Sequence, residues 1–71
     1  MKAYVVINVR PDVRVFPTYG KAFEFAKMKA DKRRGPTAVW FEDVNGNEKN
    51  VYESSPISGE SHIYIYEREI G

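Results

Sequence analysis

The stretch that most constrains the fold covers residues 17–36, PTYGKAFEFAKMKADKRRGP, because it is the one segment of this 71-residue chain with the pattern of a helix. Thr18 is a favourable N-cap residue, and the pair Gly35-Pro36 is a strong stop signal. At about 100° per residue, one arc of this helix collects the side chains that we expect to face the core. They are Tyr19, Ala22, Phe23, Ala26 and Ala30.

Before the helix, β-branched residues predict two strands. The first covers residues 2–10 and alternates between two faces, one of which carries Tyr4 and Val6. The pair Pro11-Asp12 predicts a turn, and residues 13–16 predict a second, short strand. We expect a hairpin in which Val9 pairs with Val15.

After the helix, strands are predicted over residues 37–43 and 62–70, and residues 54–60 have the composition of a loop. Between these strands, Asn45-Gly46 indicates a hairpin, because both residues accept the positive φ that a type I′ turn needs. A two-residue loop there predicts three cross-strand pairs: Val39 with Tyr52, Trp40 with Val51, and Glu42 with Lys49. We expect Val39 to point to the helix, and in the last strand we expect Ile63 and Ile65 on the face opposite to Tyr64 and Tyr66.

The resulting order, β-β-α-β-β-β, predicts an α+β fold with one mainly antiparallel sheet and a single helix packed on one face. The order of the strands in the sheet does not follow from the pattern. We expect one small domain over residues 1–71, since the chain is close to the lower size limit of a hydrophobic core.

Composition excludes several classes of protein. The chain has no cysteine, so neither a disulfide nor a thiolate metal site is expected. No apolar run is long enough to span a membrane, and the N-terminus lacks the features of a signal peptide. These observations favour a cytoplasmic protein.

Catalytic chemistry is not indicated. His62 is the single histidine and has no evident nucleophile partner, and the acidic pairs Glu42/Asp43 and Glu67/Glu69 have the pattern of solvated strand ends. The five glycines are isolated, so no phosphate-binding loop is present. We expect no enzymatic activity, no cofactor and no metal ion.

The helix carries a first candidate binding surface, the helix patch. Residues 21–34 hold six basic and two acidic side chains, which leaves a charge of −3 for the rest of this +1 chain. Two apolar side chains, Phe25 and Met28, fall outside the core arc and among the lysines. Cations near a helix C-terminus also complement its dipole, which is the structural alternative, as is a loop that covers the two apolar residues. The predicted patch comprises Lys21, Phe25, Met28, Lys29, Lys32, Arg33 and Arg34.

The sheet carries a second candidate surface on the side away from the helix. Its predicted members are Tyr4, Val6, Trp40, Val51, Tyr64 and Tyr66, which is too apolar a set for a face in water. Half-exposed strand formers, a partner chain or a second copy, and stacked bases of a single-stranded nucleic acid each explain it. The basic residues lie mostly on the helix, on the opposite side of the sheet, which disfavours nucleic acid.

We therefore expect a small non-enzymatic protein that acts by protein–protein contact, including self-association. In size and layout it resembles the short α+β proteins that phages make to inhibit host factors or defence systems. The alternative is a nucleic-acid-binding domain that uses the basic end of the helix or the aromatic sheet face.

Overall fold

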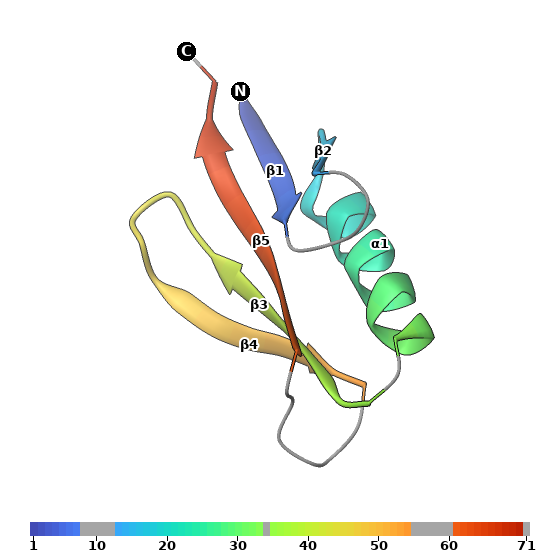
Figure 1. Ribbon diagram of the computed structural model, residues 1–71. Helices are drawn as coiled ribbons and strands as arrows, with labels where there is room; N and C mark the ends of the chain where they lie inside the picture. Colours follow the sequence, from blue (N-terminus) through green and yellow to red (C-terminus); the bar gives the residue numbers. More distant parts are fainter. Residues whose placement is uncertain (8–12, 34, 55–60, 71) are drawn as a thin grey trace.

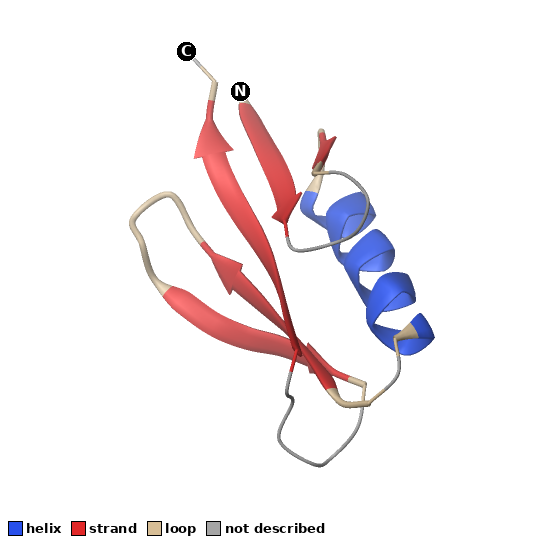
Figure 2. Cartoon of the chain, viewed as in Figure 1, coloured by secondary structure: helices blue, strands red, loops and turns tan. Residues whose placement is uncertain are grey.

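The computed structural model describes residues 1–7, 13–33, 35–54 and 61–70. Within these ranges the chain forms one helix and a five-stranded mixed sheet, so the predicted α+β fold is confirmed (Figure 1, Figure 2). The strand order is β2-β1-β5-β3-β4, and each neighbouring pair is antiparallel except β3 with β5. The elements are β1 (Lys2–Ile7), β2 (Arg14–Phe16), α1 (Tyr19–Lys32), β3 (Thr37–Glu42), β4 (Glu48–Glu53) and β5 (Ser61–Glu69).

The helix begins where the sequence predicts and ends at Lys32, with Arg33 as its C-cap, two residues before the predicted stop at Gly35-Pro36. Thr18 caps it, since its Oγ1 accepts a hydrogen bond from the Lys21 N–H at 3.3 Å. Gly35, just after the helix, has a φ of 79°, a conformation that glycine adopts without steric cost. The predicted core arc is also confirmed, because the three alanines are fully buried and Tyr19 and Phe23 pack partly buried against the same cluster.

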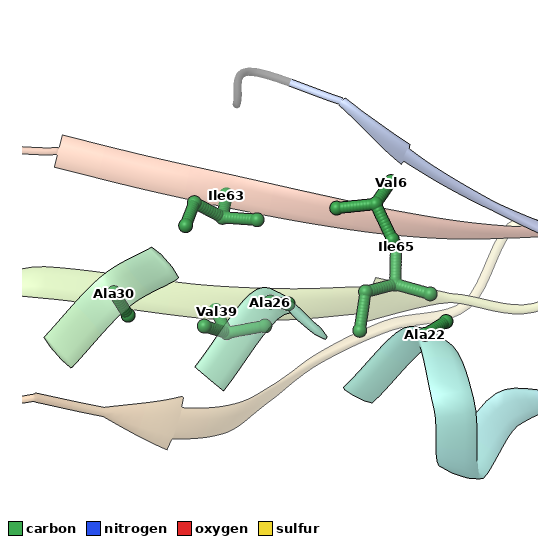
Figure 3. Close-up of a cluster of buried hydrophobic side chains, with 7 residues drawn as sticks. All are labelled: Val6, Ala22, Ala26, Ala30, Val39, Ile63 and Ile65. Carbon is green, nitrogen blue, oxygen red and sulfur yellow. The ribbon is translucent and has the colours of Figure 1, made fainter. Parts of the chain in front are cut away.

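The core lies between α1 and the three central strands of the sheet. Helix alanines let the backbone of α1 approach the sheet closely, and longer aliphatic side chains from the strands fill the space between them (Figure 3). The fully buried cluster consists of Val6, Ala22, Ala26, Ala30, Val39, Ile63 and Ile65. The predicted inward positions of Val39, Ile63 and Ile65 are therefore confirmed.

The face of β1 that packs against the helix is the opposite of the predicted one. Val6 is fully buried in the core and Tyr4 packs against the same cluster, whereas the prediction placed both away from the helix. Both faces of β1 are apolar, so alternation alone cannot choose between them. Pairing with β5 makes the choice, because Val6 lies opposite Ile65 and paired residues share a face.

Strand β2 pairs with β1 in a different register from the predicted one. Val15 lies opposite Val5, not Val9, and Phe16 lies opposite Tyr4. Phe16 thus reaches the helix side of the sheet, where it packs against Phe25 with ring centroids 5.3 Å apart. The predicted turn at Pro11-Asp12 falls outside the described residues, as does most of the predicted loop over 54–60.

The β3–β4 hairpin keeps only part of its predicted register. Val39 pairs with Tyr52 as predicted, but Trp40 pairs with Asn50 and Glu42 pairs with Glu48. The predicted pairs of Trp40 with Val51 and of Glu42 with Lys49 are therefore wrong. The register shifts between Val39 and Trp40, at a β-bulge in which Val51 is the extra residue of β4.

The turn explains this shift, because Asp43 organises a connection longer than two residues. Its Oδ1 accepts hydrogen bonds from the N–H groups of Asn45 (2.8 Å) and Asn47 (3.0 Å), and its carbonyl accepts one from Gly46 N–H at 3.0 Å. The strands therefore stop at Glu42 and resume at Glu48. The side-chain amide of Asn50 then donates to the carbonyls of Val39 and Tyr52, which flank the bulge.

Candidate binding surfaces of the sheet and the helix

The side of the sheet away from α1, which we call the outer face, carries a row of stacked rings. Ile63 and Ile65 of β5 are buried under the helix, so the alternate residues of that strand point to the outer face. Trp40 of β3 lies opposite Tyr64 and joins them. We call this group the aromatic row; its members, all half-buried, are Trp40, His62, Tyr64 and Tyr66.

Neighbouring rings of the aromatic row stack on one another. The centroids of His62 and Tyr64 are 6.1 Å apart, and those of Tyr64 and Tyr66 are 6.0 Å apart with only 10° between the ring planes. The indole N–H of Trp40 donates a hydrogen bond to Nδ1 of His62 at 3.2 Å. Each ring is thus held by its neighbours, which lowers the entropy that a partner must remove on binding.

Arg68 caps the far end of the row. Its Cζ lies 4.7 Å from the centroid of the Tyr66 ring, and its Nη2 donates to Oε2 of Glu42 at 3.1 Å. The outer face therefore already holds one guanidinium between an aromatic ring and a carboxylate.

Carboxylates border the aromatic row on β3 and β4. Glu42 lies opposite Glu48, and Glu53 points to the same face by strand alternation. Burial raises the pKa of Tyr66, and the negative charges of Glu42 and Glu48 raise it further. These three carboxylates outnumber the single guanidinium of Arg68, so the four side chains together carry a net negative charge.

The structure brings together half of the predicted sheet surface. Trp40, Tyr64 and Tyr66 lie side by side on the outer face as predicted. The other three members, Tyr4, Val6 and Val51, are on the helix side, packed in or against the core cluster. The reversed face of β1 displaces the first two, and the bulge in β4 displaces Val51.

Val5, Ile7, Val15 and His62 also border or join the aromatic row, although none of them was in the predicted set. Val5 and Ile7 lie opposite Tyr66 and Tyr64, and Val15, opposite Val5, is 62% exposed. Val5, Ile7 and Val15 lie there because β1 turns Tyr4 and Val6 toward the helix. The position of His62 could have been predicted, because it is two residues before Tyr64 and alternate residues of a strand share a face.

The helix patch divides into covered and exposed parts. Phe25 is half-buried, because Phe16 packs against its ring and the cations of Arg14 and Lys29 lie over it at 5.3 and 5.5 Å. Met28 is 42% exposed. Of the predicted basic members, Lys21 and Lys32 are exposed, Lys29 and Arg33 are half-buried, and Arg34 lies outside the described residues. The sequence left open whether Phe25 is exposed or covered, and the structure shows that Phe16 of β2 covers part of its ring.

A hollow of about 270 Å³ lies on the helix side of the sheet, beside the start of α1. Glu67 at its edge is well satisfied: its carboxylate accepts hydrogen bonds from the Tyr4 hydroxyl at 2.9 Å and the Val44 N–H at 3.3 Å. The hydrogen bond between the Tyr4 hydroxyl and Glu67 raises the pKa of Tyr4. The lining residues are Tyr4, Tyr19, Phe41, Lys49, Val51 and Glu67.

Among the described residues, no three His, Asp or Glu side chains are grouped so that they can hold a metal ion. In the same part of the chain, no helix has the length and apolar character needed to cross a membrane. Comparisons of this chain with family models, with curated proteins and with solved structures found no match.

Proposed function

We propose that this chain is a small, non-enzymatic binding protein that contacts a protein partner through the outer face. The observation that supports this most is the aromatic row, which is ordered, half-exposed and on the side that the helix leaves uncovered. Tyrosine and tryptophan are the residues most enriched among the energetic anchors of protein interfaces. The neighbouring apolar side chains Val5, Ile7 and Val15 extend the surface across β1 and β2.

Charge favours protein over nucleic acid as the ligand of this face. A nucleic-acid platform needs cations close to its stacking rings, so that phosphates are neutralised while bases stack. Here the charged side chains that border the aromatic row on β3 and β4 are the carboxylates of Glu42, Glu48 and Glu53. The cation at the end of the row, Arg68, is already paired with Glu42. The lysines of α1 lie on the opposite side of the sheet, where one strand of nucleic acid cannot reach both surfaces.

A protein of this kind acts by occupying a surface of its partner. We propose inhibition of a cellular target by such occlusion, as in phage inhibitors of host factors or defence systems. A second copy of the chain is another candidate partner for the same face. Both modes use the aromatic row and neither needs a catalytic group.

The test is a pull-down from cell lysate with and without nuclease, together with sedimentation of the purified protein. We expect nuclease-resistant capture of a protein, or self-association. Tyr64→Ala should weaken it by about 2 kcal/mol, roughly 30-fold in Kd, if Tyr64 is a central anchor. Met28→Ala removes an exposed apolar side chain from the helix instead and is the matched control.

Circular dichroism must show that both variants remain folded. Capture that survives Tyr64→Ala but is lost with Met28→Ala would move the binding surface to the helix. Capture abolished by nuclease, with steep weakening as salt rises, would establish the nucleic-acid alternative. A protein that is monomeric at high concentration and retains nothing would contradict the proposal.

A further inference from the structure

We infer that the partner presents an arginine-bearing basic segment to the outer face; this inference rests on the proposed protein-binding function. The contact that the chain makes with its own Arg68 is the first reason. That guanidinium stacks on Tyr66 and donates to Glu42, so one unit of ring plus carboxylate is already occupied by an arginine. Tyr64 and His62 continue the same stack beyond Tyr66.

Unpaired negative charge is the second reason. Glu42 and Glu48 lie directly opposite each other, and like charges in a cross-strand pair destabilise a sheet. Arg68 offsets the charge of Glu42, whereas Glu48 and Glu53 form no ion pair with any residue that the structure describes. A cation from a partner would relieve the repulsion between Glu42 and Glu48, which lie at the border of the aromatic row.

The chemistry of the face selects arginine over lysine. A guanidinium is planar, so it stacks on a ring while its N–H groups still point sideways toward carboxylates. An ammonium binds as a point charge and cannot make both contacts in the same way. The rings of Tyr64 and Tyr66 have only 10° between their planes, so the aromatic row presents rings of one orientation to a guanidinium.

The test uses a short peptide in which arginines alternate with serine and leucine, and a copy with citrulline, the uncharged isostere, in place of each arginine. Binding is followed by NMR chemical shifts of the labelled protein, with the Trp40 indole N–H as a reporter. We expect the arginine peptide to shift resonances of the outer face and to bind several-fold more tightly than the citrulline peptide. A lysine version should bind more weakly than the arginine version.

Two matched variants test whether the peptide contacts the carboxylates of the outer face. Glu48→Gln should weaken binding of the arginine peptide about two- to five-fold, the size of one exposed ion pair. Glu24→Gln removes the same charge from the exposed surface of α1 and should leave binding unchanged.

Each other result overturns the inference. Equal binding of the arginine and citrulline peptides at the outer face would leave the face as a protein-binding surface but remove the role of charge. Shifts confined to α1, or no shifts at millimolar peptide, would show that the outer face does not bind a basic segment. The proposed function is then judged separately, by whether Tyr64→Ala releases the partner captured from lysate.

Discussion

Two adjacent valines in β1 provide a sharp test of the face that this strand turns to the helix. Val6 is fully buried in the core, whereas Val5 is half-buried on the outer face. Truncation to alanine removes the same atoms at each position and costs the same strand propensity, so the difference between the two variants reports burial alone.

The expected magnitudes follow from that burial. Val6→Ala removes about 1.6 kcal/mol of transfer free energy and leaves a cavity under α1, for a total loss of about 2–3 kcal/mol. Val5→Ala gives up about half of the transfer term and leaves no enclosed cavity, so a loss of about 1 kcal/mol is expected. At about 0.05–0.15 kcal/mol per residue, a 71-residue chain has about 4–11 kcal/mol to lose.

Urea and thermal unfolding, followed by circular dichroism, measure both variants against the parent protein. Val6→Ala should lower Tm by about 10–20 °C and Val5→Ala by about 4–8 °C. The binding assay should show the reverse order, because Val5 borders the aromatic row and Val6 does not. Equal losses of stability, or a larger loss for Val5→Ala, would refute the assignment of faces in β1 and with it the composition of the outer face.

Further predictions concern the turn and the helix. Gly46→Ala should destabilise the protein by about 1 kcal/mol because of its φ of 86°, whereas Gly20→Ala, with open space around it in α1, should stabilise it by about 0.5–1 kcal/mol; chemical denaturation measures both. Thr18→Ala removes the N-cap and should cost about 1 kcal/mol in the same assay, with Thr18→Ser as the conservative control. Hydrogen bonds from backbone N–H groups, that of Asn47 foremost, lower the pKa of Asp43 in the folded state. Its contribution to stability is therefore complete above the ordinary aspartate pKa and is lost as pH falls through the lowered value; unfolding between pH 6 and about pH 2 should show a smaller acid loss for Asp43→Asn than for the parent protein.

Local signals in the sequence were sufficient for the helix and its core arc. Thr18 and Gly35 affect only the backbone within a few residues of them. The alanines of α1 are spaced so that they share one face, which is the buried face. The alternation of Ile63 and Ile65 likewise predicted the inner face of β5. Each of these features depends on the chain immediately around it.

The features that sequence reasoning missed depend on segments far apart in the chain. The inner face of β1 is chosen by Val6 meeting Ile65, and the covering of Phe25 requires the register that brings Phe16 over it. Asn45-Gly46 correctly indicated a turn, but the hydrogen bonds of Asp43 lengthened it. One residue of register was enough to exchange Val51 for Asn50 on the outer face.

The central place of β5 decides when during synthesis this protein can fold. Of the described strands it is the last to be made, yet it joins β1 to β3, and it pairs Lys2 with Glu69. Until it is available, the nascent chain contains only two separate hairpins and an unsupported helix, and isolated two-stranded hairpins are marginal in water. Pairing of distant segments is also slow. A ribosome-bound chain should therefore remain unfolded until residue 69 has left the exit tunnel, and the aromatic row then forms in the same cooperative step as the core.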